Sequence, residues 1–165
     1  MIIRENDDRL DELEVAMLEN FEPVHCLTTH KFTDGMYIRE IFMPAGSLIT
    51  SKIHKTEHPY IVSYGKVAVS IDSDEWHEIT APYTGITKPG TRRVLYILED
   101  CIWTTFHRVE GMKSKYNDLN DEEKENIVKK LNGNFNFSSG VIAFNEGFIN
   151  DENRFFIEEI KNAEL

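Results

Sequence analysis

Cysteine and long hydrophobic runs are scarce in this sequence, and each shortage excludes a class of protein. The two cysteines, Cys26 and Cys101, are too few and too far apart for a disulfide framework or a CxxC motif. No stretch approaches the ~18 consecutive apolar residues that a membrane span requires, and the first residues turn acidic before a signal sequence could form. We therefore expect a cytoplasmic protein with no membrane partner.

Basic residues are also scarce relative to acidic ones. The chain has 18 Lys and Arg against 29 Asp and Glu, for a formal net charge of -11. Such a chain attracts phosphate backbones only weakly, so we expect no nucleic-acid partner. A length of 165 residues suits one domain, 1–165, that can bury enough surface to fold without disulfides or metal.

Helical periodicity occurs only near the two ends of the sequence. Apolar residues recur at three- and four-residue spacing over 6–21, which predicts an N-terminal helix. Residues 120–133 combine a capped start, an apolar face and a glycine where a helix would end. Residues 150–162 have an apolar side and are typical of a terminal helix. We expect a helical arm at 6–21 and a helical C-terminal extension at 118–165.

Between about 30 and 110 the pattern changes to short β-rich runs that turn residues separate. The expected strands are 36–42, 49–53, 60–64, 67–71, 76–79, 93–98 and 102–107. Because no helix intervenes, the pattern favours an antiparallel sandwich or barrel over a βαβ fold. A two-residue turn at 99–100 would place Arg93 and His107 on opposite faces of their hairpin. Either a bulge then shifts the register or only one of them reaches the interior.

A stretch bounded by two glycines, GSLITSKIHKTEHPYIVSYG at 46–65, resembles the first motif of the cupin family. The ligand positions of that motif are occupied here by Lys52, His54 and His58. A second stretch, TKPGTRR at 87–93, resembles the second cupin motif and has Arg93 at the position of the family's last histidine.

The resemblance spans residues 36–109 and implies a mainly-β fold, a cupin-like double-stranded β-helix (jelly-roll barrel), with an N-terminal helix and C-terminal helices added. In general, the sequence resembles small cupins of unknown function that are found in bacteria and their phages. By analogy with that family, we expect a homo-oligomer such as a homodimer. Cupins differ widely in activity, so the resemblance implies no particular reaction.

Histidines supply the candidate metal ligands. On one continuous strand, His54 and His58 would share a face, and the cupin motif brings residues at this spacing to one ion. His107, near the end of the last expected strand, is the third candidate ligand. Neutral imidazoles suit a divalent transition metal, Zn, Fe, Ni or Cu.

Three further residues are candidate contacts for a small ligand in the barrel. Lys52 and Arg93 would hold an anionic group, and Tyr60, on the same face as His58, would orient it. Alternative interpretations are that Arg93 forms a surface ion pair and that Lys52 extends into solvent along an apolar surface. Trp103 is expected in the core.

Three functions remain open at this level. The first is a metal-binding cupin that binds, and could transform, a small polar and anionic ligand. The second is a non-catalytic module that senses or sequesters a small molecule without metal. The third is a structural protein whose histidines are hydrogen-bonded core residues.

Overall fold

The computed structural model describes residues 26–51, 56–71, 76–91, 93–135 and 142–145. The helices expected at 6–21 and 150–162 lie outside the described residues, as do Lys52 and His54. Within the described part of the chain, no helix is long and apolar enough to cross a membrane.

Antiparallel strands dominate the described residues. They are β1 (Thr28–Thr33), β2 (Met36–Met43), β3 (Ser47–Thr50), β4 (His58–Ile71), β5 (His77–Thr80), β6 (Tyr83–Thr87), β7 (Arg93–Arg108) and β8 (Ile142–Asn145). A short 3-10 helix, η1 (Ser114–Asp118), and one α-helix, α2 (Asp121–Phe135), follow β7. The predicted mainly-β fold class, a rolled antiparallel sheet, is confirmed, and α2 confirms the helix expected at 120–133.

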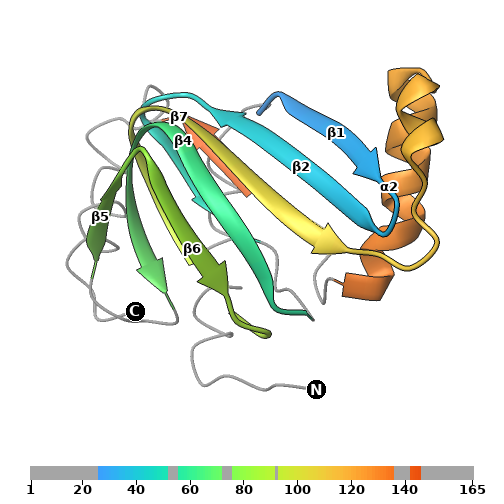
Figure 1. Cartoon of the computed structure of the whole chain (residues 1–165). Coiled ribbons are helices and arrows are strands. Elements are labelled where there is room, and N and C mark those ends of the chain that lie inside the picture. The colour runs from blue at the N-terminus through green and yellow to red at the C-terminus, as the bar shows by residue number, and fades with distance from the viewer. Residues whose placement is uncertain (1–25, 52–55, 72–75, 92, 136–141, 146–165) are drawn as a thin grey trace.

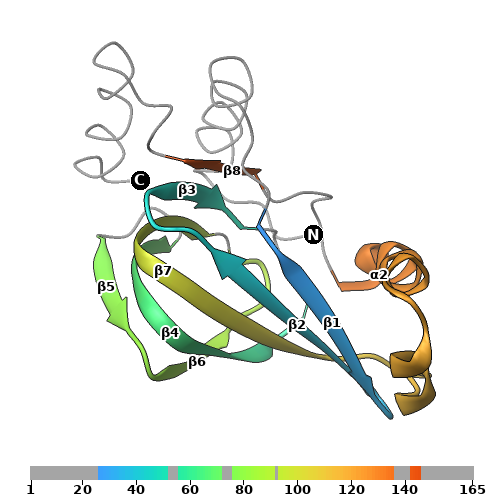
Figure 2. The same cartoon turned by 90° about the horizontal axis from the view of Figure 1, so that it is seen from above.

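The two longest strands, β4 and β7, lie side by side and link the two halves of the rolled sheet (Figure 1). In one half, the end of β7 and the start of β4 are flanked by β2 with β1 and by β6. In the other half, the start of β7 and the end of β4 are flanked by β3 with β8 and by β5. Seen from above, the strands curl around a common interior (Figure 2).

β4 changes its inward face at a bulge around Gly65. The register with β7 shifts on both sides of this glycine, so the turn expected at 64–66 is instead an irregularity within one strand. Gly65 has φ +88, and a Cβ there would overlap the carbonyl of Asp100. Before the bulge the buried side chains of β4 fall at even positions, His58, Tyr60 and Val62. After it the buried apolar side chains fall at odd positions, Val67 and Val69, although Ser70 is buried too.

β7 is a single strand, so the turn expected at 99–100 is wrong. Glu99 instead pairs with Lys66 beside the bulge of β4. Arg93 and His107 stand an even number of residues apart on this strand, and both are buried, with 6% and 1% of their surface exposed. The predicted conflict between their faces therefore does not arise.

His54 and His58 would share a face only on one continuous strand, and that condition is not met. β3 ends at Thr50 and β4 begins at His58, and Thr56 and Glu57, which precede His58, belong to no strand. Strand parity therefore cannot relate the two histidines, because parity holds only within a continuous strand.

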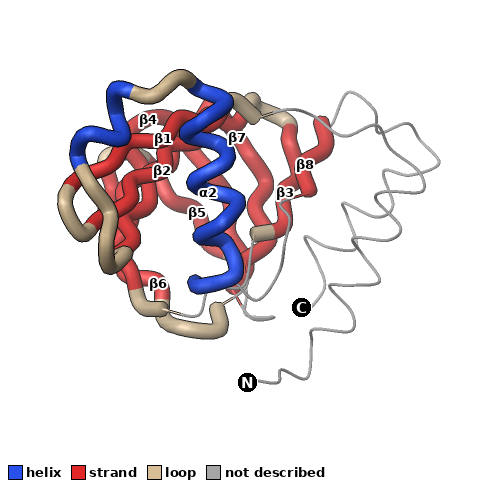
Figure 3. Tube along the Cα trace, turned by 90° about the vertical axis from the view of Figure 1, so that its right-hand side faces the viewer, coloured by secondary structure: helices blue, strands red, loops and turns tan. Residues whose placement is uncertain are grey.

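The helix α2 packs at the end of the barrel where β1 and β2 meet (Figure 3). Its start is capped by Asn120, whose side-chain oxygen accepts a hydrogen bond of 2.8 Å from the backbone N–H of Glu123. Val128 contributes to a small apolar cluster with Phe32, Tyr37, Val109 and Met112. This cluster is separate from the larger core cluster inside the barrel, and it holds the helix against the strands.

Candidate functional site

A small cavity lies inside the barrel, and its walls come from most of the strands. Its volume is about 50 Å³, well below the roughly 300 Å³ at which pockets for drug-sized molecules begin. Polar and charged side chains line part of it: Arg39, Ser51, His58, Thr87, Arg93 and Thr105. Apolar side chains line the remainder: Ile41, Met43, Ile49, Leu95 and Trp103.

Arg93 places a buried positive charge in this cavity. Its guanidinium carbon lies 5.0 Å from the ring centroid of Tyr60 and 5.7 Å from that of Trp103. These two rings are themselves stacked, with centroids 4.6 Å apart, and they stabilise the cation through their π faces. The Nε of Arg93 is buried and has no hydrogen-bond partner among the described residues. The side chain of Tyr60 also forms a hydrogen bond with Arg93, which engages one donor of the guanidinium and leaves Nε without a partner.

A second arginine, Arg39 on β2, lines the same cavity opposite Thr105 of β7. Burial lowers the pKa of Arg39, but a guanidinium remains charged at any physiological pH. Burial also lowers the pKa of Arg93, and the neighbouring Tyr60 opposes that change. Among the residues that the structure describes, no Asp or Glu forms an ion pair with either arginine. The cavity thus contains two cations and no described anion.

His58 is a neutral member of this site. Its Nδ1–H donates a hydrogen bond of 3.2 Å to the carbonyl of Thr56, which leaves the lone pair of the neutral ring on Nε2. Burial, and then the charges of Arg93 and Arg39, lower the pKa of His58 to about 4, while the bond to Thr56 opposes this shift. Both guanidinium charges therefore act on the same part of the cavity.

The structure brings together two of the three predicted metal ligands. The ring centroids of His58 and His107 lie 4.4 Å apart, and His107 also contacts the hydroxyl of Thr105 through Nε2 at 2.9 Å. The third predicted ligand, His54, is outside the described residues. Within the described ranges, no group of three His, Cys, Asp or Glu side chains could hold a metal ion. The described donor set is two imidazoles beside two guanidinium groups, whose charge opposes a divalent cation.

Only one of the three residues predicted to contact a small ligand lines the cavity in the described part of the chain. Arg93 lines the cavity, as expected. Tyr60 is buried against Arg93 and is not among the described lining residues. Trp103 belongs to the core cluster, as expected, and also forms part of the cavity wall. Lys52 lies outside the described residues.

The sequence analysis missed Arg39. β2 has one charged residue on each face: Arg39 lies among apolar side chains on one face and Glu40 among apolar side chains on the other, so neither face is clearly polar. The only available signal was that Arg39 has the same parity as two large apolar residues. Burial of that face became evident only once β2 was paired with β7.

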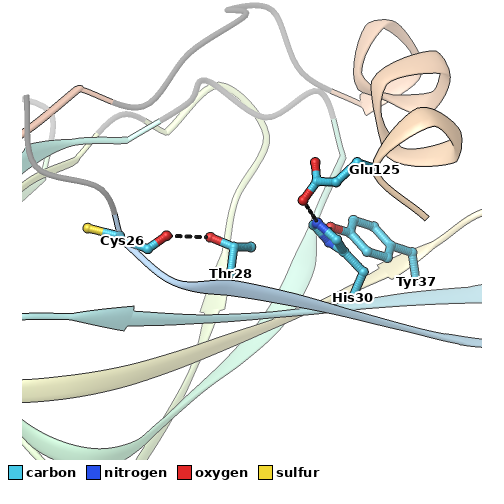
Figure 4. A network of polar contacts seen from close by, with 5 residues as sticks. All are labelled: Cys26, Thr28, His30, Tyr37 and Glu125. Carbon is cyan, nitrogen blue, oxygen red and sulfur yellow. Dashed lines mark hydrogen bonds and ion pairs between the residues drawn. The ribbon is translucent and has the colours of Figure 1, made fainter. Parts of the chain in front are cut away.

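The sequence analysis also missed a polar network that joins α2 to the barrel (Figure 4). Glu125 of α2 accepts a hydrogen bond of 2.7 Å from Nε2 of His30, whose Nδ1 lies 2.5 Å from the hydroxyl of Tyr37. The ring of Tyr37 stacks against His107, with centroids 5.8 Å apart. The network therefore extends from the helix surface to the pair of buried histidines.

No protein-family model matches the sequence, and no curated protein matches it. Solved structures similar to this chain include an RmlC-like cupin family protein with a double-stranded β-helix fold from Methanocaldococcus jannaschii, which is 10% identical. That alignment covers 60% of this chain and 93% of the other, with a TM-score of 0.43.

Two other similar structures are also described as cupins. A cupin superfamily protein from Desulfitobacterium hafniense is 11% identical over 59% of this chain and 89% of its own, with a TM-score of 0.45. The Cnp3 cupin domain of Schizosaccharomyces pombe is 12% identical over 70% of this chain and 74% of its own, also with a TM-score of 0.45.

Proposed function

We propose that the barrel cavity binds a small anion, which Arg93 and Arg39 hold together. The observation that carries this proposal is the buried guanidinium of Arg93, which lines the cavity and has an Nε without a hydrogen-bond partner among the described residues. A buried charge that lacks both a counter-ion and a partner for one of its donors is destabilising by several kcal/mol. An anion bound in the cavity would supply both.

The cavity walls offer further donors for such an anion. Thr87 is buried and pairs with His58 across β4 and β6, and Thr105 pairs with Arg39 across β2 and β7. Hydroxyl groups can donate hydrogen bonds to an anion, and guanidinium groups bind carboxylate or phosphate oxygens in a fork geometry. Two cations and two hydroxyls around a cavity of about 50 Å³ suit an anion of few atoms.

Anion titrations of matched arginine variants test the proposal. Acetate and inorganic phosphate are titrated at constant ionic strength into the full chain, and binding is followed by amide chemical shifts. We expect Arg93→Met, which keeps a similar length without charge, to lose at least about tenfold in affinity. Arg108→Met is the control, because Arg108 is exposed on the same strand, and it should change affinity less than about twofold. Equal binding by the protein and Arg93→Met would refute the proposal.

The thermal stability of Arg93→Met without added anion gives a second criterion. If the main role of Arg93 is to bind an anion, Arg93→Met should unfold at the same temperature as the unmodified protein or at a higher one, because the variant no longer buries a desolvated charge. If Arg93 serves the fold alone, its loss should lower the melting temperature through the lost contacts with Tyr60 and Trp103.

A metal centre of His54, His58 and His107 is the second candidate function, and the 4.4 Å approach of the His58 and His107 rings favours it. A site of this kind would provide Lewis-acid chemistry for a bound ligand. Titration of tag-free protein with Zn²⁺, Ni²⁺ or Co²⁺ tests it. A rise in melting temperature that His58→Ala abolishes supports the metal centre, and no rise with any of the three ions counts against it.

A further inference from the structure

The anion that this cavity accepts has a recognisable class, because polar and apolar groups are separated along its walls. On β2, Arg39, Ile41 and Met43 face the cavity at two-residue intervals, about 7 Å per step. Across the pair of strands, Arg39 lies opposite Thr105, and the next inward pair is Ile41 with Trp103. The wall therefore changes from charged to apolar within one step along the strand.

The opposite wall changes in the same way. Arg93 on β7 is followed two residues later by Leu95, which pairs with Ile49 of β3. Ser51, next to Arg93, accepts a hydrogen bond of 2.8 Å from the Arg93 backbone N–H, so this end of the wall is polar. On this wall too, the apolar pair of Leu95 and Ile49 lies next to a charged residue, Arg93.

The two charged positions belong to one end of the cavity. Arg39 pairs with Thr105, which pairs on its other side with Tyr60, and the guanidinium carbon of Arg93 lies 5.0 Å from the Tyr60 ring centroid. In contrast, Ile41, Met43, Ile49 and Leu95 form part of one continuous core cluster. A ligand that spans the cavity would therefore meet cations at one end and hydrocarbon at the other.

We infer that the ligand is a short aliphatic monocarboxylate, an inference that rests on the proposed anion site. Its carboxylate would bind the two guanidinium groups, and its unsubstituted hydrocarbon chain would contact Ile41, Ile49 and Leu95. The small volume limits the chain to a few carbons. A hydroxyl on that chain would be buried against apolar side chains without a partner, which disfavours hydroxy acids and sugar derivatives.

A series of simple acids tests the ligand class with the full chain. Acetate, propionate, butyrate and hexanoate are titrated at constant ionic strength, with lactate as the hydroxylated match of propionate and inorganic phosphate as the anion without hydrocarbon. We expect affinity to rise about fourfold for each methylene until the cavity is full, and then to fall. Lactate should bind at least about fivefold more weakly than propionate.

Two variants at the apolar end sharpen the test. Ile41→Thr keeps a β-branched side chain but places a hydroxyl in the cavity wall, so it should reduce the gain in affinity from acetate to butyrate. Ile38→Thr on the same strand is the control, because Ile38 faces the other side of β2 and does not line the cavity. If Ile41→Thr does not fold, the acid series on the unmodified chain still decides the question.

The outcomes separate this inference from the proposed function. Binding that depends on Arg93 but does not rise with chain length, or that favours phosphate or lactate, would overturn the carboxylate class and leave the anion site intact. Binding of no acid, or binding that Arg93→Met does not change, would overturn the anion site itself and with it the ligand class.

Discussion

The imidazole rings of His58 and His107 lie 4.4 Å apart between centroids, although they come from the first residue of β4 and the penultimate residue of β7. Both side chains are buried, with 2% and 1% of their surface exposed. A protonated His58 in this position would add a charge to a region that already contains Arg39 and Arg93. The pair is therefore sensitive to pH, and this sensitivity can be measured.

We expect His58 to make folding dependent on pH. Its pKa is about 4 in the folded protein against 6.5 when unfolded, so the unfolded chain binds more protons between these values. The resulting stability is present above about pH 6.5 and is lost as the pH falls through 4. The difference corresponds to about 3 kcal/mol in the free energy of unfolding. Urea unfolding at pH 7.5 and 4.5 should show a smaller loss for His58→Gln than for the unmodified chain, and equal losses would contradict this prediction.

Gly65 should tolerate no side chain, because its positive φ and the bulge both require a bare Cα. Gly65→Ala should lose roughly 1–2 kcal/mol from the left-handed backbone, and more from the displacement of the Asp100 carbonyl. Gly35→Ala is the matched control, since Gly35 has φ +82 and open space around its Cα. Chemical denaturation should show a clearly larger loss for Gly65→Ala. Equal losses of stability in the two variants would mean that the overlap with the Asp100 carbonyl does not contribute to the destabilisation.

Glu125 should stabilise the attachment of α2 to the barrel. Its carboxylate accepts a hydrogen bond from His30 at 2.7 Å, but about half of the Glu125 side chain is exposed. We therefore expect Glu125→Ala to reduce the free energy of unfolding by less than about 1 kcal/mol. Glu122→Ala, an exposed acidic residue in the first turn of the same helix, is the control. Hydrogen exchange of α2 amides should accelerate only for Glu125→Ala, and unchanged exchange would show that the helix is held by apolar contacts alone.

Tyr60 should act on the anion site more through its ring than through its hydroxyl, although the hydroxyl also hydrogen-bonds Arg93. Tyr60→Phe keeps an aromatic face under the Arg93 guanidinium and should change acetate affinity less than about twofold. Tyr60→Leu removes that face and should weaken acetate binding about three- to tenfold. Chemical-shift titrations give the acetate affinity of both variants. A large loss of affinity with Tyr60→Phe would indicate that the hydrogen bond to Arg93 contributes more than the ring.

The local pattern of turn residues and apolar residues in the sequence was enough to predict much of the fold. Turn residues at 34–35, 44–46 and 89–90 separate strands in the structure, each with a glycine at positive φ. The helix at 120–133 was also evident, because its cap and its apolar face are local properties. Three strands were missed: β1, β6 and β8. β1 and β6 are short edge strands with several exposed side chains, and β8 lies within 118–165, where a helical extension was expected.

The sequence by itself determined the alternation of the strands, the turns between most of them, and the presence of His58, His107 and Arg93 as candidate site residues. Only the tertiary structure decided that Arg39 joins Arg93 in one cavity and that β7 continues through 99–100. The reason is physical: turns and helix caps depend on neighbours in sequence, whereas the inward face of a strand depends on its partners across the barrel. A single bulge at Gly65 reverses the inward face of β4. This bulge is a shift in the register of β4 against β7, which lies far away in the sequence.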